Sequence, residues 1–383
     1  MGKKYVLHIV IFFLFAVAPV QAALQVTAYA DDDTWLNGHE SGKEWTNYGT
    51  DYYLYVYGDT SGGNNKPEKN SLMRFSLPSL GSGYHIQSAT VRMNYAGYED
   101  MDSNDGVYVD LYAVRPSRTW TEMGANWYTM NGSSYWAQAG CESPDWDRYN
   151  TSLGQQFFTR STAGGDKDWT NSNLTQTVRD WYSGTLTNNG LVARTSSHYT
   201  YKEGVFFYSN DYGLDWGPRL IITYTLDPVA NADGPYSVGP GEDVLFNGSG
   251  SYDPDGGSIV SWQWDLDNDG QYDDAWGSTV LKSYVYLTDT LGLLPGQHNI
   301  GLKVGDDDGE WKTTTSTLII EPYDGDFEPD GDVDWDDMAF IAYYWLNSNC
   351  GEPHWCDGTD LDYSGTVDFY DYAIFAANWL AGV

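Results

Sequence analysis

The chain has 383 residues, a formal net charge of −35 and an aromatic content of 16%. This length exceeds what one hydrophobic core organises and predicts two or three domains. The negative charge argues against nucleic acid or an anionic lipid surface as the partner and favours salt or a divalent metal ion. Abundant Gly, Tyr, Trp and Thr favour β-structure, so we expect a mostly β protein.

The first 22 residues, MGKKYVLHIVIFFLFAVAPVQA, have the composition of an export signal. Two lysines precede an apolar run of about 14 residues, whereas a membrane span needs about 20. Small residues follow at Val20 and Ala22, where a signal peptidase cleaves. We therefore predict a signal peptide over 1–22. The mature chain is expected to be secreted, extracellular or at the cell surface, with no membrane span.

The distribution of charge marks three domains. Residues 23–226 contain 14 basic and 23 acidic residues, and residues 227–322 contain 3 and 17. Residues 323–383 contain 14 acidic residues and no Lys or Arg. The segments TLDPVANADGP and IIEPYDGD carry the Pro, Gly and Asp residues typical of linkers at the two boundaries.

The first domain, 23–226, contains many short segments typical of strands. They are LQVTAYA, DYYLYVYG, LMRFSL, ATVRMNY, VYVDLYAV, GLVAR, GVFFYS and RLIITY. Alternation with period two is clear in YYLYVYG and VYVDLYAV, and one amphipathic segment, LTQTVRDWYSG, interrupts the strands. The pattern predicts an antiparallel β-sandwich of jelly-roll type.

Several of these segments resemble, in the same order, the DNRLRE domain: NYGTDYYLYV, LMRFSLPSL, IQSATVRMNY, WTEMGANW, LTQTVRDWYSGTLTNNGL and RLIITY. That family is similar to disaggregatase-related modules and to carbohydrate-binding modules for acidic polysaccharides such as alginate. The arginine motif that names the family is only partly present, around Arg74. The resemblance implies a β-sandwich that binds polysaccharide.

The segment 120–150 is the predicted glycan site because it is rich in aromatic residues between Gly, Asn and Ser turns. Sugar faces stack on exposed aromatic rings, and acidic sugars pair with Arg. The candidate ligand-binding residues are Trp127, Tyr128, Trp136, Trp146 and Arg148. The alternative is that these rings fill one end of the sandwich. That is the stronger interpretation for Trp120 and Trp127, which match the core pattern of the resembled family.

No catalytic residue is assigned. The histidines of residues 23–383 form no triad or metal motif with their neighbours, and the many acids identify no pair. A polysaccharide lyase or glycoside hydrolase with its active site in the first domain is one alternative to a binding protein. A structural cell-surface or matrix protein without a glycan ligand is the other.

The second domain, 227–322, shows strand-like runs separated by turns: EDVLFNGSGS, IVSWQWDLD, STVLKSYVYL, QHNIGLKVGD and TTSTLIIEP. The phrases NADGPYSVGPGEDVLFNGSGSYDPDG, WQWDLDNDG and LKVGDDDGEW resemble the PKD domain. This implies an immunoglobulin-like sandwich that serves as a connector or a binding module. Asp265, Asp267 and Asp269 have the spacing of a calcium loop, but Trp276 occupies its last ligand position. A hairpin turn is therefore favoured over a metal site.

The third domain, 323–383, contains two acidic loops with the ligand spacing of an EF-hand. In DFEPDGDVDWDD, acids occupy positions 1, 3, 5, 9 and 12, and Gly331 is at position 6. The second copy spans 360–371. An acidic turn before a helix is the alternative, which two matches in one register make much weaker. The predicted Ca²⁺ ligands are Asp326, Glu328, Asp330, Asp332 through its carbonyl, Asp334 and Asp337, then Asp360, Asp362, Ser364, Thr366, Asp368 and Asp371.

A helix is predicted after each loop, in DDMAFIAYYWL and YDYAIFAANWL, and each is expected to begin at its loop's last acid. The two helices share small and large apolar residues that we expect to pack on one face, namely Ala339 and Ala373, Ala342 and Ala376, Trp345 and Trp379, and Leu346 and Leu380. Such a small all-α domain has little core, so metal binding should supply much of its folding energy.

These paired EF-hand-like units, over 324–381, resemble the type I dockerin. The resemblance implies a calcium-bound module that attaches to a cohesin-like partner on a scaffold or cell surface. The chain departs from the usual Ser/Thr pair at loop positions 10 and 11, which hold Trp335 and Asp336, then Phe369 and Tyr370. Between the loops, Cys350 and Cys356 are close enough to form a disulfide, which leaves Cys141 unpaired.

Overall fold

The computed structural model describes residues 23–59, 66–101, 106–196, 203–328 and 330–382. The predicted signal peptide lies outside these residues. The chain forms two compact units, Met1–Thr225 and Leu226–Val383. Within the described residues, no helix combines the length and apolar character needed to cross a bilayer.

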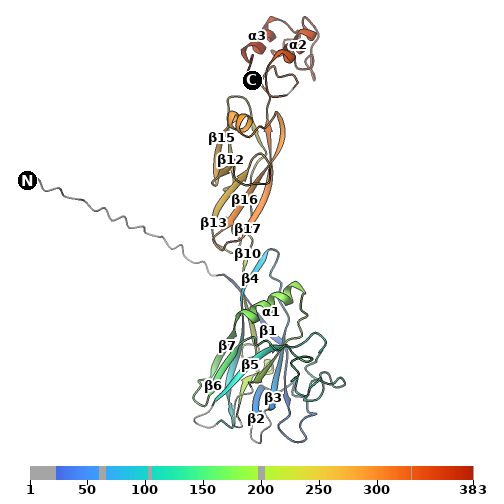
Figure 1. Cartoon of the computed structure of the whole chain (residues 1–383), viewed down its shortest axis with the longest axis vertical. Helices are drawn as coiled ribbons and strands as arrows, with labels where there is room; N and C mark the ends of the chain where they lie inside the picture. Colours follow the sequence, from blue (N-terminus) through green and yellow to red (C-terminus); the bar gives the residue numbers. More distant parts are fainter. Residues whose placement is uncertain (1–22, 60–65, 102–105, 197–202, 329, 383) are drawn as a thin grey trace, which may run out of the picture. The chain divides into compact units, whose positions relative to one another are not determined.

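The first unit is built on one ten-stranded sheet (Figure 1). The strand order is β1-β10-β4-β9-β2-β3-β8-β5-β6, with β7 paired to β4 and an extra pairing of β1 with β3. The elements are β1 Leu24–Asn37, β2 Tyr53–Asp59, β3 Lys66–Phe75, β4 Tyr84–Glu99, β5 Gly106–Ala113, β6 Gln155–Thr159, β7 Gly165–Thr170, α1 Ser172–Ser183, β8 Leu191–Thr195, β9 Glu203–Tyr208, η1 Asn210–Tyr212 and β10 Arg219–Leu226.

Strand β1 joins two parts of this sheet because it changes partner along its length. Its first half, from Leu24 to Tyr29, pairs antiparallel with β10. Its second half, from Ala30 to Asn37, pairs antiparallel with β3 after an irregularity between Ala30 and Asp32. Bulges bend a strand and allow it to pass from one face of a sandwich to the other. The sheet therefore curls round its core as a β-barrel or sandwich, and the prediction of a mostly β domain is confirmed.

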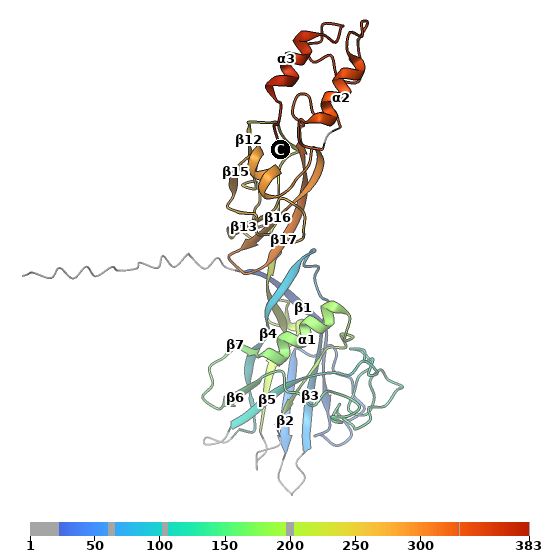
Figure 2. The same cartoon turned by 45° about the horizontal axis from the view of Figure 1, so that its top comes forward.

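Helix α1 lies against β4 (Figures 1 and 2). It buries Leu174, Val178 and Trp181, which recur at the helical spacing of one face. The side chain of Asn171 accepts a hydrogen bond from the Leu174 amide at the N-terminus, and Gly184 ends the helix in the left-handed conformation at φ 74°. The two short strands before α1, β6 and β7, were not predicted from the sequence.

A long segment without strands, residues 115–154, covers the outer face of β1, β3 and β8. It forms a second core with those strands, separate from the core inside the curled sheet. The buried members are Leu36, Leu72, Val114, Trp120, Ala125, Met130, Trp136, Cys141 and Val192. The apolar side chains of this segment therefore serve first to close one face of the domain.

The second unit begins with a two-sheet sandwich. One sheet has the order β11-β17-β16-β13-β14, and the other pairs β12 with β15. The elements are β11 Tyr236–Val238, β12 Asp243–Asn247, β13 Ile259–Asp265, β14 Ala275–Trp276, β15 Thr279–Ser283, a helical turn η2 Tyr286–Thr290, β16 Gly296–Asp306 and β17 Trp311–Ile320. Phe246, Trp264, Leu302 and Leu318 are among its fully buried residues. β13 and β14 pair antiparallel with Gln263 opposite Trp276, which is the hairpin favoured for this segment.

Two short helices follow the sandwich, α2 Trp335–Tyr344 and α3 Phe369–Ala377. Each begins two residues before its loop's last acid, so the predicted start was wrong. The physical reason is a capping box: Asp334 caps α2 while Asp337 accepts the Asp334 amide, and Asp368 and Asp371 repeat the arrangement at α3.

The prediction that the shared apolar positions pack together holds for Trp345 and Trp379, which lie against the small core, and is wrong for the alanines and leucines. Leu346 is 71% exposed and Leu380 is 54% exposed, and the four shared alanines are exposed. The small core is instead formed by Val333, Ile341, Cys350, Val367 and Phe375. Two of these are loop valines at position 8 of each loop, so the loops supply packing that the helix pattern alone did not indicate.

Candidate functional site

Two of the predicted glycan contacts, Trp136 and Arg148, are buried in the first unit, so this part of the prediction was wrong. Trp136 is 5% exposed, and its Nε1 donates to the Asn126 carbonyl oxygen at 3.0 Å. Arg148 is also 5% exposed, and its guanidinium lies 4.3 Å from the centre of the Tyr112 ring. Neither side chain can stack on or pair with a sugar, because segment 115–154 folds onto the sheet.

Buried Asp147 holds this segment in place. Its Oδ1 accepts the Ala137 amide at 2.8 Å, and its Oδ2 accepts the Gln138 amide at 2.9 Å. Arg118 pairs with the same carboxylate at 3.0 Å. An ionised carboxylate that receives several such donors is stable when buried, so the loop is a rigid part of the domain.

The other three predicted residues have different positions. Trp127 is half-buried and fills the space beside two glycines: a Cβ added at Gly38 would lie 2.3 Å from its ring, and one at Gly140 would lie 2.4 Å away. Tyr128 is half-buried and contacts the exposed ring of Trp45 at 4.8 Å. Trp146 is 66% exposed and remains free to contact a ligand.

A larger aromatic surface lies on the outer face of β2 and β9. We call it the tyrosine surface, and its members are Tyr52, Tyr53, Tyr208, Tyr212 and Trp216. Tyr53 and Tyr208 face each other across the strands, with ring centres 5.4 Å apart. The Tyr208 ring lies 4.3 Å from Tyr212 and 5.1 Å from Trp216. Tyr52 is 58% exposed, and Tyr212 and Trp216 are each 45% exposed.

The rings continue from the tyrosine surface across the sheet. The centres of Tyr53 and Phe206 are 5.2 Å apart, and those of Phe206 and Tyr55 are 5.4 Å apart. Tyr55 lies 4.8 Å from Trp35, which stacks on Tyr48 at 3.9 Å. Trp35 is buried, so the exposed part of the row is formed by Tyr55, Phe206 and the tyrosine surface, on which apolar sugar faces can stack.

The sequence contained a signal for this surface. In YYLYVYG, Leu54 and Val56 point to the buried side, and Tyr53 and Tyr55 alternate with them on the other side. Tyrosine at each outward position supplies far more ring area than strand pairing needs. The alternation predicted the strand correctly, but it did not mark the outward rings as a site.

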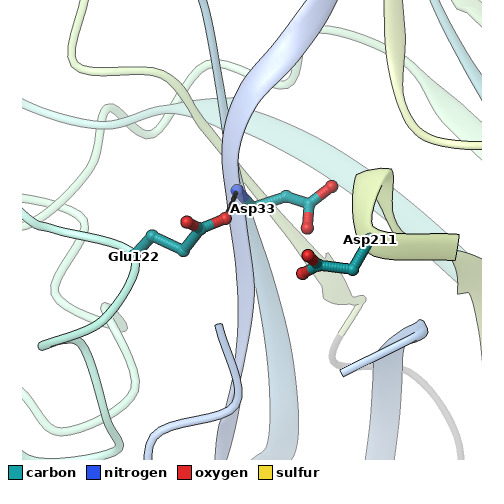
Figure 3. Close-up of side chains that lie close together, drawn as sticks. All are labelled: Asp33, Glu122 and Asp211. Carbon is teal, nitrogen blue, oxygen red and sulfur yellow. Dashed lines mark hydrogen bonds between the residues drawn. The ribbon is translucent and has the colours of Figure 1, made fainter. Parts of the chain in front are cut away.

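Three acidic side chains from distant segments meet next to the tyrosine surface. Asp33 on β1, Glu122 in the long segment and Asp211 in η1 each offer a carboxylate oxygen within 4.8 Å of the others (Figure 3). The Asp33 amide donates to Glu122 at 3.1 Å, and the Asn210 amide donates to Asp33 at 2.7 Å. Burial, opposed by the Asn210 bond and assisted by nearby acids, raises the pKa of Asp33 to about 7.

Several cations of this unit are already paired with acids. Ion pairs with carboxylates are made by at least six of the Lys and Arg side chains within its described residues: Lys69, Arg74, Arg92, Arg118, Arg194 and Arg219. Arg148 is buried as described above. An anionic ligand therefore meets fewer cations that are free to turn toward it.

The two acidic loops of the second unit have the same internal bonding. The position 1 carboxylate accepts two loop amides: Asp326 accepts those of Asp330 and Gly331, at 3.2 and 3.1 Å. Asp360 in the second loop accepts those of Ser364 and Gly365, at 3.0 and 2.8 Å. This repeat shows that both loops turn in the same way.

The last acid of each loop is fully buried and accepts a hydrogen bond from the backbone amide of position 9. Asp337 accepts it from Asp334 at 2.8 Å, and Asp371 accepts it from Asp368 at 2.7 Å. In the first loop, burial together with neighbouring acids raises the pKa of Asp326 to about 6 and that of Glu328 to about 7. Such crowding of oxygen ligands without cations is what a Ca²⁺ ion stabilises.

The structure also shows where the acids of the β13–β14 hairpin and the three cysteines lie. Asp265, Asp267 and Asp269 bring carboxylate oxygens within 4.8 Å of one another in the β13–β14 hairpin. Cys350 and Cys356 are joined by a disulfide, with their Cα atoms 5.0 Å apart. Cys141 is free and buried, and burial raises the pKa of its thiol.

Comparison with known proteins gives two family matches. Residues 24–147 match the model of carbohydrate-binding module family 96, and residues 225–320 match a PKD domain model. No curated protein matches the chain.

Two solved structures match the second segment. The PKD1 domain of Vibrio anguillarum Epp is 31% identical, with 25% of this chain and 96% of that chain covered and a TM-score of 0.19. The PKD1 domain of the Vibrio cholerae metalloprotease PrtV is 27% identical, with 25% and 99% covered and a TM-score of 0.19. By its two family matches alone, the chain carries a family 96 carbohydrate-binding module over residues 24–147, followed by a PKD domain over residues 225–320.

Proposed function

We propose that this is a secreted protein that binds polysaccharide through the tyrosine surface of its first unit. The observation that carries the proposal is the continuous row of rings on β2 and β9, in a unit whose residues 24–147 match a carbohydrate-binding module. Tyr52 and Tyr53 lie within the matched residues. Tyr208, Tyr212 and Trp216 lie beyond them and extend the same surface. Export through a signal peptide over 1–22 gives the protein access to extracellular polysaccharide.

The proposed mode of binding is stacking rather than charge pairing. Ring stacking recognises the apolar face of a sugar whether or not the sugar is charged. At least six Arg and Lys side chains in this unit are held by carboxylates, and Asp33, Glu122 and Asp211 add negative charge beside the rings. An acidic polysaccharide such as alginate would therefore bind here with a divalent cation as the bridge, whereas a neutral polysaccharide would need none.

A glycan array probed with the full chain tests the proposal, in calcium and again in chelator. Replacing Tyr212 and Trp216 together by Ala removes two exposed rings, each of which contributes about 0.5–1.5 kcal/mol. Retention should fall by about tenfold or more. Trp276→Ala is the matched control, since this exposed ring lies in the second unit. Equal retention of the double variant and the parent would contradict the assignment of the site.

The acid cluster does not favour the hydrolase alternative. Asp33 is 1% exposed, so a glycosidic oxygen cannot approach its carboxylate closely enough for proton transfer. The same array glycans, incubated with the parent and analysed for shortened products, test this point directly. Release of unsaturated or reducing ends would support a lyase or hydrolase in place of the binding protein.

We further propose that residues 323–383 form a calcium-dependent dockerin-like module that attaches the protein to a cohesin-like partner, with the PKD domain as a spacer. Support comes from the repeated amide bonding of the two loops and from the absence of Lys and Arg in this segment. The residues at loop positions 10 and 11 are open to a partner: Trp335 is 72% exposed, Phe369 75% and Tyr370 74%.

Hydrogen exchange on the full chain tests the metal part of this proposal. Chelation should speed exchange of the amides in 326–344 and 360–377, because metal binding supplies folding energy to such small domains. Amides in β13 and β16 of the PKD sandwich serve as the internal control and should not change. If helix amides exchange at the same rate with and without calcium, the loops do not hold functional metal sites.

A further inference from the structure

We propose that Asp33, Glu122 and Asp211 form a calcium site in the first unit. This goes beyond the proposed function, which places calcium in the C-terminal loops and leaves open only a bridging ion to an acidic glycan. The three ligands come from β1, from segment 115–154 and from η1. Asp33 and Glu122 are 89 residues apart in the sequence, and Asp33 and Asp211 are 178 apart. A site assembled from such distant segments can exist only in the folded domain.

The cluster has the dimensions of an ion site. Its three oxygens lie within 4.8 Å of one another. Ca²⁺ binds oxygen at about 2.3–2.6 Å, so two of its ligands lie at most about 5.2 Å apart. The backbone holds the carboxylates at this separation, because the Asp33 amide donates to Glu122 Oε1 and the Asn210 amide donates to Asp33 Oδ2.

An independent observation is the unsatisfied oxygen of Asp33. The residue is 1% exposed, and its Oδ1 has no hydrogen-bond donor among the residues that the structure describes. Figure 3 shows the carboxylates of Asp33 and Asp211 facing each other across a short gap. A buried anionic oxygen without a donor costs several kcal/mol unless a positive partner is present. The arrangement therefore points to a cation between these side chains.

Within the described part of the chain, no ion pair of these three carboxylates with Lys or Arg is found. Arg74 is a basic residue whose charge acts on Glu122, and its guanidinium is already bonded to Asp32. Asp32 also adds to the negative field that acts on both Asp33 and Glu122. A water molecule would relieve one oxygen but would leave three neighbouring carboxylates uncompensated.

The donor set selects the kind of metal. All three ligands are carboxylate oxygens, with no His or Cys in the cluster, which disfavours Zn²⁺ and other softer metals. Asp33 is buried and Asp211 is exposed, so one side is enclosed and the other is open to water. Ca²⁺ accepts such an irregular set completed by water, whereas Mg²⁺ demands near-octahedral geometry. The ion would fix η1, which carries Tyr212, against β1.

The test uses the full chain and a change at the exposed ligand. Asp211→Asn removes one charge at a surface position and should leave the fold intact. Asp215→Asn is the matched control, because this exposed acid lies on the same turn outside the cluster. Calcium titration calorimetry counts bound ions in both variants, and hydrogen exchange reports the amides of 31–35, 119–125 and 209–213.

With calcium at about ten times the dissociation constant, exchange of these amides in the parent and in Asp215→Asn should slow about tenfold. Asp211→Asn should lose one bound ion and most of this protection, while the amides of the C-terminal loops respond to calcium as in the parent. If Asp211→Asn binds as many ions as the parent, or if calcium leaves the three segments unprotected in the parent, the site does not exist.

Discussion

Nη2 of Arg194 on β8 lies 2.7 Å from Oε2 of Glu142 in segment 115–154, and the two side chains are only 10% and 8% exposed. A second bond joins Nε to Oε1 at 3.2 Å. Burial, together with the nearby positive charge of Arg194, lowers the pKa of the neighbouring Arg148. Glu142 therefore compensates a buried pair of arginines and attaches the long segment to the sheet.

Glu142→Gln should destabilise the first unit by about 3–5 kcal/mol, since it leaves Arg194 buried without a countercharge. Denaturant unfolding followed by tryptophan fluorescence measures this, with hydrogen exchange in 115–154 to locate the effect. Asp145→Asn changes an exposed acid of the same segment and should stay within about 0.5 kcal/mol of the parent. A small effect for Glu142→Gln would mean that the segment is held by packing alone.

Trp136→Phe tests the correction made to the glycan site. The variant loses the Nε1 bond to Asn126 and part of a buried ring, so the unit should lose about 1–3 kcal/mol of stability. Its retention on glycans at a temperature where it remains folded should equal that of the parent. A selective loss of glycan retention without a loss of stability would restore Trp136 as a ligand contact.

Asp33→Asn should stabilise the calcium-free protein, with a clear pH dependence. Burial raises the pKa of Asp33 from 3.8 to about 7, so the folded parent binds a proton more tightly than the unfolded chain between about pH 4 and pH 7. The stability of the parent therefore falls as the pH rises through this window, and Asn removes that slope. The gain should be about 2–4 kcal/mol at pH 8 and near zero at pH 4.

In excess calcium the parent should be more stable than Asp33→Asn, because calcium binding stabilises the parent and the variant has lost a ligand. Thermal unfolding of both proteins, in chelator and in calcium at pH 5 and at pH 8, measures their difference in stability under each of the four conditions. Asp215→Asn should show the pH profile of the parent. A destabilised Asp33→Asn in chelator at pH 8 would show that the carboxylate is satisfied in the calcium-free domain.

The two C-terminal loops should differ in calcium affinity. The first offers five carboxylates at ligand positions and the second four, with Ser364 at position 5. A higher ligand charge favours calcium, so Asp360→Ala, which retains the first loop, should bind more tightly than Asp326→Ala. Calorimetry of the two full-chain variants decides the order, and tighter binding by Asp326→Ala would refute the charge argument.

Acid should weaken the first loop more than the second. The pKa of Glu328 is raised to about 7 and that of Asp326 to about 6, chiefly by burial. In the second loop, burial also raises the pKa of Asp360, but the bond with Ser364 lowers the pKa of Asp362. Protons compete with calcium at the higher pKa values first. Lowering the pH from 8 to 6 should therefore reduce the affinity of Asp360→Ala by a larger factor than that of Asp326→Ala.

Thiol labelling should distinguish the three cysteines. Cys350 and Cys356 are disulfide-bonded and should stay unlabelled in the oxidised, unfolded protein. Cys141 is fully buried with a raised thiol pKa, so it should react only after unfolding. Mass spectrometry after labelling in native and denaturing buffer gives the pattern. Labelling of Cys350 or Cys356 before reduction would rule out the bond.

Much of the fold followed from local patterns, because strand alternation and loop spacing are short-range signals. The core alternation in β2 and β5 and the ligand spacing of the acidic loops needed no knowledge of distant contacts. The short strands β6 and β7 were missed because GDKDWT, which forms β7, contains three charged residues and only one residue that is buried. Its pairing with β4 supplies what its own sequence lacks.

The site was harder to predict because exposure depends on tertiary packing. Trp136 and Trp146 lie in one aromatic-rich segment, yet one is 5% exposed and the other 66%. Composition could not separate them, since only the fold of the segment onto β1, β3 and β8 decides which ring is covered. The acid cluster was invisible for the same reason: Asp33, Glu122 and Asp211 share no sequence spacing.

The pairing of β1 with β10 governs when the first unit can fold. Leu24–Tyr29 is the first strand to leave the ribosome, and its partner Arg219–Tyr224 is the last of the unit. Contacts at such long sequence separation delay folding, because a large loop must close before they form. The first strand must therefore wait for nearly the whole unit to be synthesised. On the export route proposed above, the chain would be threaded through the channel unfolded, and the sheet would close only after the last strand had followed.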